Sequence, residues 1–135
     1  MHMNFKITKF EKHNDERGQL IVFLKCNELK GKLKKFGQIY FVTFERVGVV
    51  RGNHYHKKWR EWFGIVSGKL EVKLKDIVTG EKKRIVFDGR SNKYERLEIG
   101  PGIAHTFKSL SKNASLLNYA NHEWSKDDTF VYKLI

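Results

Sequence analysis

Cysteine, proline and long apolar runs are scarce in this chain. One cysteine, Cys26, is present among 135 residues, so the chain cannot form an internal disulfide. No stretch approaches the roughly 18–20 uninterrupted apolar residues that cross a bilayer. The first ten residues, MHMNFKITKF, lack the apolar segment of a signal peptide. We therefore expect a soluble, cytoplasmic protein without a membrane partner.

Acidic residues are also scarce relative to basic ones. The 27 Lys and Arg residues exceed the 15 Asp and Glu residues, which gives a formal net charge of +12 at pH 7 and an isoelectric point near 9.8. Such an excess attracts anions over long range, and nucleic acid, acidic lipid and a phosphorylated metabolite all meet that condition. The basic residues are scattered, and no run of about five or six like charges forms a tail. This scatter favours a single site for an anionic ligand over a nucleic-acid groove.

Helical patterns are nearly absent, and the apolar residues repeat with a period of two. The segment at residues 38–44, QIYFVTF, is rich in β-branched and aromatic residues, as strands are. Leu70, Val72 and Leu74 alternate with charged residues, which is typical of a half-buried antiparallel strand. The best helical candidate, residues 26–32, is short. Further strands are expected at residues 63–66, 84–87, 97–99, 106–110 and 116–119, with glycine-containing turns at residues 67–68, 79–80 and 100–102.

Many short strands joined by tight turns predict an all-β protein with one core. A chain of 135 residues has the common size of a single domain, and no linker or change of composition divides it. We therefore expect residues 1–135 to form one domain, either a sandwich or a barrel. The pattern alone leaves a jelly roll, a lipocalin-like barrel and an immunoglobulin-like sandwich open.

The segment at residues 48–68, GVVRGNHYHKKWREWFGIVSG, carries the most specific group of reactive side chains. His54 and His56 are two residues apart, so on a strand they point to the same face. Two imidazoles in a partly enclosed cavity suit either proton transfer or metal binding. Glu61 follows after an expected bend, and His105 follows the glycine-proline-glycine turn, so both are candidates for the same cavity.

These residues resemble the two sequence motifs of the cupins. The first motif, Gly-x5-His-x-His-x4-Glu-x6-Gly, is matched at every fixed position, and the core of the second, Gly-x2-His, is matched as well. In the second motif, Gly100 stands where proline is usual and Ser109 stands where asparagine is frequent. The resemblance implies a cupin jelly roll, the double-stranded β-helix. The matching residues are Gly48, His54, His56, Glu61 and Gly68 in the first motif and Gly102 and His105 in the second.

A narrower resemblance, over residues 7–132, is to the sugar-nucleotide cupins. The runs DERG (residues 15–18), RGNHYHK (residues 51–57) and PGIAHTF (residues 101–107) carry it. That group includes dTDP-4-dehydrorhamnose 3,5-epimerases, dTDP-6-deoxyhexulose 3,4-ketoisomerases and the cupin domain of capsular polysaccharide reductases. The resemblance implies a nucleoside-diphosphate 4-keto sugar as substrate, a role in deoxysugar or polysaccharide biosynthesis, and a homodimer. Two phosphates on the substrate also give the positive charge of the chain a purpose.

The resemblance implies that the two histidines of the first motif transfer protons. A proton on the carbon beside a ketone is weakly acidic, so its removal needs a positioned base and stabilisation of the enolate. His54 is the expected base, which takes the C3 proton of the 4-keto sugar to give an enediol, and His56 is the expected shuttle between the two oxygens. Lys57 and Arg51 are expected to stabilise the developing oxyanion. The expected substrate contacts are Arg17, which would touch the nucleotide, and Tyr40, Arg51, His105 and Tyr119.

Epimerisation of the same class of substrate is the alternative reaction. The 3,5-epimerases need an acid on the opposite face of the sugar, commonly a tyrosine in the strand after the second motif. Here that position falls on Asn118, with Tyr119 one place further and on the other face. Their catalytic histidine also contacts an aspartate from a longer C-terminal region, for which this chain offers Asp127 and Asp128. These departures favour 3,4-ketoisomerisation, which generally proceeds without a metal cofactor.

Two other kinds of function stay open at this point. His54, His56, Glu61 and His105 form the three-histidine, one-glutamate ligand set of metal cupins, which suits Zn, Fe, Mn or Ni, and some relatives in the capsular group carry zinc. A non-catalytic module that binds a nucleotide sugar or nucleic acid is the other alternative, since three aromatic residues between positions 55 and 62 lie among basic ones. A nucleic-acid module would leave the cupin spacing of the histidines unexplained, so nucleic acid is not an expected partner.

Overall fold

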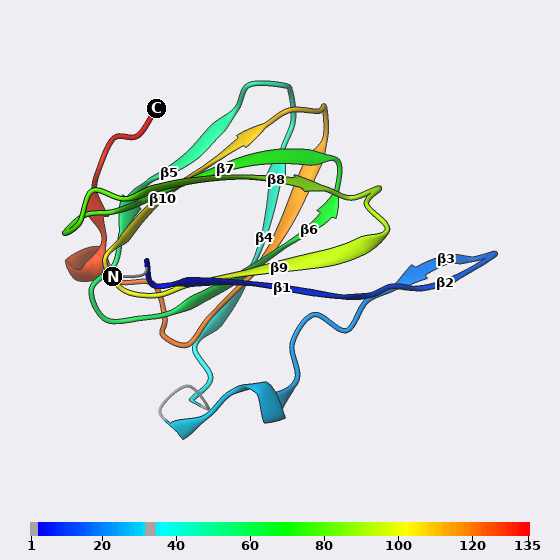
Figure 1. Cartoon of the computed structure of the whole chain (residues 1–135), viewed down its shortest axis with the longest axis horizontal. Coiled ribbons are helices and arrows are strands. Elements are labelled where there is room, and N and C mark those ends of the chain that lie inside the picture. Colours follow the sequence, from blue (N-terminus) through cyan, green and yellow to red (C-terminus); the bar gives the residue numbers. More distant parts are fainter. Residues whose placement is uncertain (1–2, 32–34) are drawn as a thin grey trace.

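Two five-stranded antiparallel sheets, packed face to face, make up the body of the protein (Figure 1). The computed structural model describes residues 3–31 and 35–135. In spatial order, the first sheet contains β1 (Phe5–Glu11), β9 (Lys93–Ile99), β6 (Glu61–Ser67), β11 (Ala114–Ala120) and β4 (Gln38–Phe44). The second sheet contains β12 (Phe130–Val131), β5 (Val50–Tyr55), β10 (Ile103–Ser109), β7 (Lys69–Asp76) and β8 (Lys82–Asp88). From β4 to β11 the chain changes sheet at every step except β7 to β8, as in a jelly roll, so the all-β prediction is confirmed.

Several short elements lie outside these sheets. β2 (His13–Asp15) and β3 (Gly18–Leu20) form a hairpin that projects from the end of β1 (Figure 1). After β3, residues 21–31 pass below the first sheet in the view of Figure 1 and contain the 3-10 turn η1 (Cys26–Glu28). A second 3-10 turn, η3 (Lys126–Asp128), precedes β12. Within the described residues, no helix has the length and apolar character needed to cross a membrane.

The core lies between the two sheets, where the period-two pattern places the apolar side chains. Leu70, Val72 and Leu74 of β7 are at most 1% exposed, whereas the residues between them are partly exposed on the outer face. Phe44 of β4 and Phe87 of β8 are buried to the same degree. Alternation along each strand thus supplies one apolar layer per sheet, and the two layers pack against each other.

The sequence pattern predicted the central strands better than the first ones. The strand expected at residues 38–44 has the bounds of β4, and the other expected strands lie at β6 to β11. β1 was not predicted, because Ile7 and Phe10 are three residues apart and break its alternation. The helical candidate at residues 26–32 is wrong, since its described part forms only the three-residue η1, and Gly31 has a φ of +57°.

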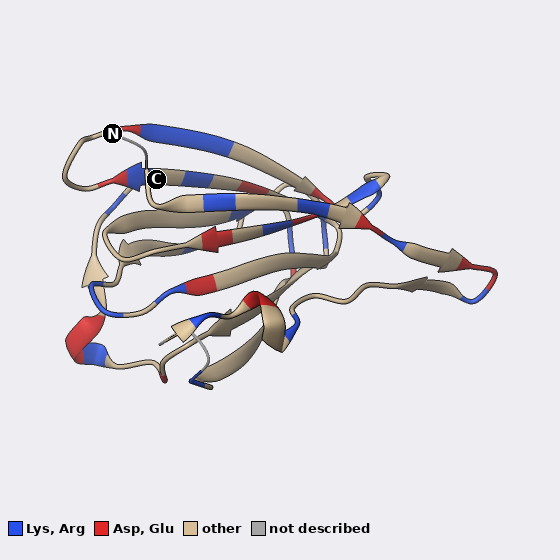
Figure 2. Cartoon of the chain, turned by 60° about the horizontal axis from the view of Figure 1, so that its bottom comes forward, with Lys and Arg blue, Asp and Glu red and all other residues tan. Residues whose placement is uncertain are grey.

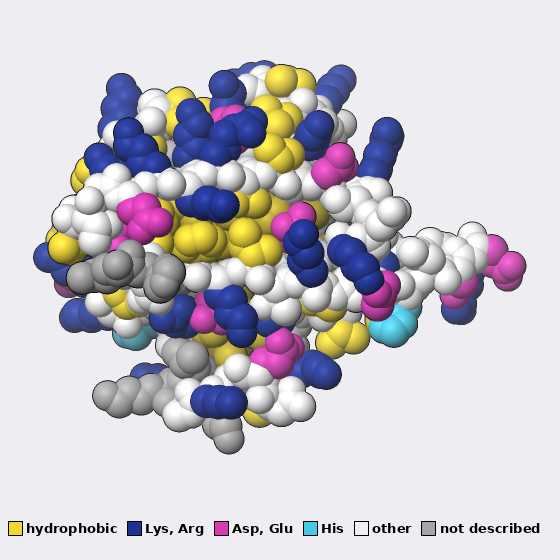
Figure 3. All heavy atoms as spheres, viewed as in Figure 1, with side chains coloured by type: hydrophobic (Ala, Val, Ile, Leu, Met, Phe, Trp, Pro, Cys, Tyr) yellow, Lys and Arg dark blue, Asp and Glu magenta, His cyan; other side chains and the backbone are white. Residues whose placement is uncertain are grey.

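Charged residues are spread along the strands of both sheets and occur at the tip of the β2–β3 hairpin (Figure 2). Lys and Arg side chains stand along the side of the molecule formed by the second sheet (Figure 3). There the Arg84 Nε donates to Glu71 Oε2 at 2.7 Å. The hydrogen bond from Arg84 lowers the pKa of Glu71, and Lys73 and Lys108 lower it further. One carboxylate on this face therefore lies among several cations.

We expect the shared core to respond strongly to a truncation in β7. Leu70→Ala removes a side chain that is 0% exposed and should lower the free energy of unfolding by about 2–5 kcal/mol. Urea denaturation of both proteins measures this difference. Val78→Ala is the matched control, because Val78 is 85% exposed and its truncation should change stability by less than about 0.5 kcal/mol. Equal losses in the two variants would contradict the proposed core.

Candidate active site

A cavity of about 280 Å³ opens between the two sheets and contains the histidines singled out in the sequence. Its buried lining combines apolar and aromatic side chains with ionisable ones, whereas Tyr40, Arg51, Gly52 and Trp124 are its exposed members and mark its mouth. Polar and ionisable side chains face this space from both sheets. The lining residues are Tyr40, Val42, Phe44, Arg51, Gly52, His54, His56, Glu61, Phe63, His105, Phe107, Leu116, Asn118 and Trp124.

An unusual backbone conformation at Gly52 and a shift of register bring His54 beside His105. Gly52 has a φ of +102°, and a Cβ at this position would lie 2.6 Å from the His105 carbonyl oxygen. A side chain is therefore excluded, and β5 can approach β10 closely. The register shifts between His105 and Thr106, so that His54 lies opposite His105. Their ring centres are 4.8 Å apart, edge to face.

His56 follows the last residue of β5 and forms a buried pair with Glu61, the first residue of β6. Its Nε2 lies 2.9 Å from Glu61 Oε1, and its Nδ1 lies 2.7 Å from the carbonyl oxygen of Asp128. A carbonyl and a carboxylate can only accept hydrogen bonds, so both ring nitrogens of His56 must donate. The geometry therefore places both His56 ring nitrogens against acceptors, one of which is the buried Glu61 carboxylate.

Glu61 is buried and keeps its negative charge because three side chains surround it with donors. Burial alone would raise the pKa of Glu61, but the hydrogen bond from His56, together with that from Trp59, holds it below its usual value. Trp59 Nε1 donates to Oε1 at 2.8 Å, and Asn118 Nδ2 lies 3.4 Å from Oε2. A buried carboxylate needs such donors, since leaving it without them would be costly.

His54 and His105 have the opposite character and resist protonation. Burial lowers the pKa of His54 to about 4, and the nearby His105 and His56 add to that shift. Burial also lowers the pKa of His105, although Glu61 opposes the effect. His105 Nδ1 lies 3.0 Å from the carbonyl oxygen of Ile103 and so carries hydrogen, which leaves Nε2 with a lone pair. The cavity therefore contains two imidazoles that burial keeps neutral, beside the His56 ring, whose two nitrogens both face acceptors.

Tyr40 and Arg51, two of the expected substrate contacts, also line the cavity. Burial raises the pKa of the Tyr40 hydroxyl, and Glu61 raises it further, so this group stays protonated and can donate. The Arg51 guanidinium lies 5.6 Å from the centre of the Phe44 ring. Both residues stand at the mouth, where they can meet the part of a ligand that extends outside.

Three other predicted site residues lie elsewhere in the molecule. Lys57 is exposed, and its Nζ lies 4.3 Å from the centre of the Phe130 ring. Tyr119 faces the outer side of β11, where it packs on Trp62. Arg17 is exposed in the hairpin that projects from the body, and it pairs with Asp15 at 2.6 Å. Within one chain, the structure does not bring these three side chains to the cavity.

Trp59 is a site residue that the sequence did not indicate, and Asp128, which the resemblance offered as a partner of a catalytic histidine, contacts His56 in an unexpected way. Trp59 is 3% exposed, and its ring centre lies 4.0 Å from that of His56. Asp128 is 3% exposed and contacts His56 through a backbone carbonyl, an atom that every residue has. The residue type at position 128 therefore gave no sign of this contact, whereas Trp59 could have been suspected from its place two residues before Glu61.

The histidines lie close enough together to be considered as metal ligands. One nitrogen from each of His54, His56 and His105 lies within 4.8 Å of the others. A metal needs a lone pair from each ring, however, and both nitrogens of His56 point at acceptors. Metal binding would require the proton between His56 and Glu61 to leave. As arranged, this donor set fits a shared proton better than a metal ion, and we derive no step through a metal.

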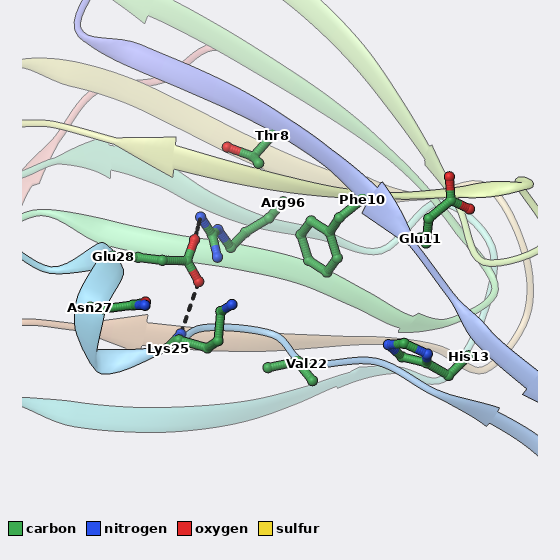
Figure 4. Close-up of a pocket in the computed structure, with 9 residues that line it drawn as sticks. All are labelled: Thr8, Phe10, Glu11, His13, Val22, Lys25, Asn27, Glu28 and Arg96. Carbon is green, nitrogen blue, oxygen red and sulfur yellow. Dashed lines mark hydrogen bonds and ion pairs between the residues drawn. The ribbon is translucent and has the colours of Figure 1, made fainter.

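A second pocket, of about 420 Å³, lies between β1, β9 and the segment that contains η1 (Figure 4). Arg96 Nη2 donates to Glu28 Oε2 at 2.6 Å, and its Nη1 donates to the carbonyl oxygen of Phe23 at 2.7 Å. The hydrogen bond from Arg96 also lowers the pKa of Glu28. The two charges neutralise each other, so this pair ties the η1 segment to the first sheet.

Comparison with known proteins agrees with this architecture. The family model described as "WxcM-like, C-terminal" (FdtA) matches residues 3–133. The chain belongs to the WxcM-like family. A UDP-2-acetamido-2,6-β-L-arabino-hexul-4-ose reductase of Pseudomonas aeruginosa is 29% identical over 121 residues, which are 89% of this chain and 30% of the reductase. The spore coat polysaccharide biosynthesis protein SpsL of Bacillus subtilis is 27% identical over 118 residues, with coverages of 84% and 76%. This WxcM-like chain thus spans less than a third of the reductase and most of SpsL.

Solved structures share the fold of this WxcM-like protein. A 3,4-ketoisomerase from Helicobacter canadensis has a TM-score of 0.78 at 27% identity, with coverage of 96% of this chain and 91% of that one. The dTDP-6-deoxy-D-glucose-3,5-epimerase RmlC from Legionella pneumophila has a TM-score of 0.82 at 22% identity, with coverages of 98% and 74%. The latter likeness concerns the fold alone. The cupin jelly roll expected from the two motifs is therefore confirmed.

The low pKa of His54 can be tested directly. The carbon-bound ring protons of His54 should titrate by NMR with a midpoint near pH 4, whereas the urea-unfolded chain should give the ordinary value near 6.5. Because the unfolded state then binds protons first, the contributions of His54 and His105 to stability should fall as pH decreases from about 6.5 toward about 4. A folded-state midpoint near 6.5 would contradict the buried, neutral base.

Proposed function

We propose that this chain is an isomerase of nucleoside-diphosphate 4-keto-6-deoxy sugars and catalyses 3,4-ketoisomerisation through an enediol. One observation carries the proposal. An unprotonated His54 lies beside the proton-carrying His56–Glu61 pair in one small cavity, with 5.0 Å between the two histidine ring centres. Groups whose surroundings push their pKa values apart are suited to act as base and acid.

The reaction moves protons without a change in oxidation state of the whole sugar. His54 takes the proton from C3, and the electron pair of that bond forms the C3–C4 double bond. The C4 oxygen receives the Nε2 proton that His56 otherwise donates to Glu61. The enediol then gives up the proton of its C3 oxygen to His56, and C4 receives the proton held by His54. The carbonyl has moved from C4 to C3, and both histidines have their initial protonation.

The cavity is large enough for only one part of the proposed substrate. At about 280 Å³ it is at the lower limit of ligand pockets, so we place the sugar ring inside and the nucleoside diphosphate outside. Arg51 and Trp124 stand at the mouth, where a guanidinium can pair with phosphate and an indole can stack on a base. A 3,4-ketoisomerase from Thermoanaerobacterium thermosaccharolyticum has been solved with TDP, which supports a nucleotide of this kind.

Epimerisation is the second candidate, and Asn118 makes it the weaker one. Inversion at a carbon needs an acid on the face opposite the base. The side chain of β11 that faces the cavity is Asn118, and its amide nitrogen points toward Glu61 and the carbonyl oxygen of Trp62. An amide does not supply a proton as a tyrosine hydroxyl does. Ketoisomerisation returns the proton from the same base and needs no second acid at that position.

Solvent isotope exchange tests the proposed reaction. The purified protein should introduce deuterium from D2O into dTDP-4-keto-6-deoxyglucose while the carbonyl migrates to C3, and 13C NMR of the sugar carbons follows both events. His54→Asn should lower the rate by at least about 100-fold, because the variant lacks the base. Lys57→Ala should retain most of the activity, since that side chain lies over Phe130.

The other outcomes separate the alternative reactions. Deuterium at C3 or C5 without migration of the carbonyl would indicate an epimerase. Activity that disappears with a chelator and returns with zinc would indicate a metal-dependent enzyme in place of the proposed proton transfer by His56. Tight binding of the nucleotide sugar without exchange would indicate a binding module.

We further propose that the protein is a homodimer. Every residue of β2 and β3 is exposed, yet a two-stranded hairpin is marginally stable alone. β4 forms one edge of the first sheet, and its outward Ile39 and Phe41 are exposed, which invites a neighbouring surface. A second copy would cover these features, and Arg17 could then meet a nucleotide bound by the partner. A cytoplasmic location stays a prediction of the sequence.

Sedimentation tests the dimer. The wild-type protein should sediment at twice the chain mass of 16.0 kDa, and Phe41→Glu should shift it toward the single chain by placing a charge in the interface. Val78→Glu is the control, because Val78 is exposed in the turn between β7 and β8. A wild-type protein that sediments as one 16.0 kDa chain at micromolar concentration would refute the dimer.

A further inference from the structure

Residues 125–135, here called the strap, run along the strand that carries the histidines. Within the strap, Phe130 pairs with Tyr55 and Val131 pairs with His54. The Tyr55 and Phe130 rings also stack, with 5.2 Å between their centres. The strap therefore supplies β5 with its neighbour on the side away from β10.

Asn53 fixes the far end of the strap. It has a φ of +57°, a conformation that asparagine adopts more readily than most residues. Its Oδ1 accepts hydrogen bonds from the backbone N–H groups of Leu134, at 2.7 Å, and Ile135, at 3.2 Å. The Asn53 carbonyl accepts from the N–H of Tyr132 at 2.7 Å. The residue directly before His54 is thus bound to the strap through both its side chain and its backbone.

Asp128 fixes the near end, where β5 stops and His56 begins the turn to β6. Its Oδ1 accepts from the backbone N–H of Lys57 at 2.9 Å, and its Oδ2 accepts from that of Lys58 at 3.0 Å. Its carbonyl oxygen lies 2.7 Å from His56 Nδ1. Three consecutive residues therefore place a donor on this one buried aspartate.

We propose that Asp128 is a positioning residue that holds the His56 ring for proton transfer. The carboxylate fixes the backbone on which His56 stands, and the carbonyl fixes Nδ1–H, so Nε2 must point at Glu61. Trp59 closes the remaining side, since its ring lies against that of His56. This inference rests on the proposed isomerase function, but the hydrogen bond to His56 can be observed without it.

A purely structural role for Asp128 makes a different prediction. If the carboxylate only closed a surface loop, its loss would lower stability and leave the His56 ring and the reaction unchanged. In a positioning role, loss of the carboxylate changes both the His56 ring and the rate, because displacement of a reacting group by about 1 Å can lower the rate about 100-fold. Asp127, the adjacent residue in η3, is exposed and carries the same charge. It is therefore the matched control for the change in charge.

The experiment compares Asp128→Ala, Asp128→Asn and Asp127→Ala with the wild-type protein, after melting curves have shown that each is folded. In the wild type, NMR should detect a slowly exchanging His56 Nδ1–H and a coupling through the hydrogen bond to the Asp128 carbonyl carbon. Asp128→Ala keeps the carbonyl but loses the carboxylate that places it, so it should speed exchange of the Nδ1–H, weaken the coupling and lower kcat for carbonyl migration about 10- to 100-fold, with KM within about twofold. Asp128→Asn keeps the shape but turns an NH2 group toward a backbone N–H, so its loss should be intermediate. Asp127→Ala should match the wild type.

Several results would overturn the inference. A wild-type spectrum without the coupling would do so even if no variant folds. Unchanged ring signals in a folded Asp128 variant would do so as well, whatever its rate. If the wild type catalyses no exchange, the proposed function fails, and the ring signals still decide whether Asp128 holds His56.

Discussion

A carboxylate buried in an aromatic cavity is the constraint on which the rest of the site depends. Glu61 is the first residue of β6 and is 8% exposed, so its charge needs donors from the protein itself. His56 and Trp59 provide two of them at 2.9 Å and 2.8 Å. The buried Glu61 carboxylate therefore needs the hydrogen bond from His56 for stability, whether or not that proton also takes part in catalysis.

The other two histidines stay neutral mainly because they are buried. Their proximity to His56 lowers their pKa values further, and Glu61 opposes this effect. Three histidines in water would titrate together. In this cavity His56 donates hydrogen bonds, whereas His54 and His105 stay neutral. This difference allows one ring to give a proton and another to take one.

Much of this site was predictable from local spacing, and the rest depended on contacts that spacing does not encode. The two-residue interval between His54 and His56 predicted a shared cavity, although His56 lies just beyond β5. The alternation of side chains along β11 also predicted that Asn118 faces the cavity and Tyr119 faces away from it. The expectation that Tyr119 contacts the substrate therefore conflicted with this alternation. Arg17 and Lys57 were expected at the site from sequence motifs, but their positions depend on the hairpin and on Phe130.

Asp128 shows where prediction stopped: the resemblance offered it as a contact of the catalytic histidine, but not the atom through which it acts. It is 72 residues from His56 in sequence and acts there through a carbonyl oxygen, which leaves no trace in the residue type. Its carboxylate is specific, but its partners are backbone N–H groups, which every non-proline residue also has. A motif records the side chains that meet the substrate. The atoms that hold those side chains in place are identified only from the contacts of the strap with β5 and with His56.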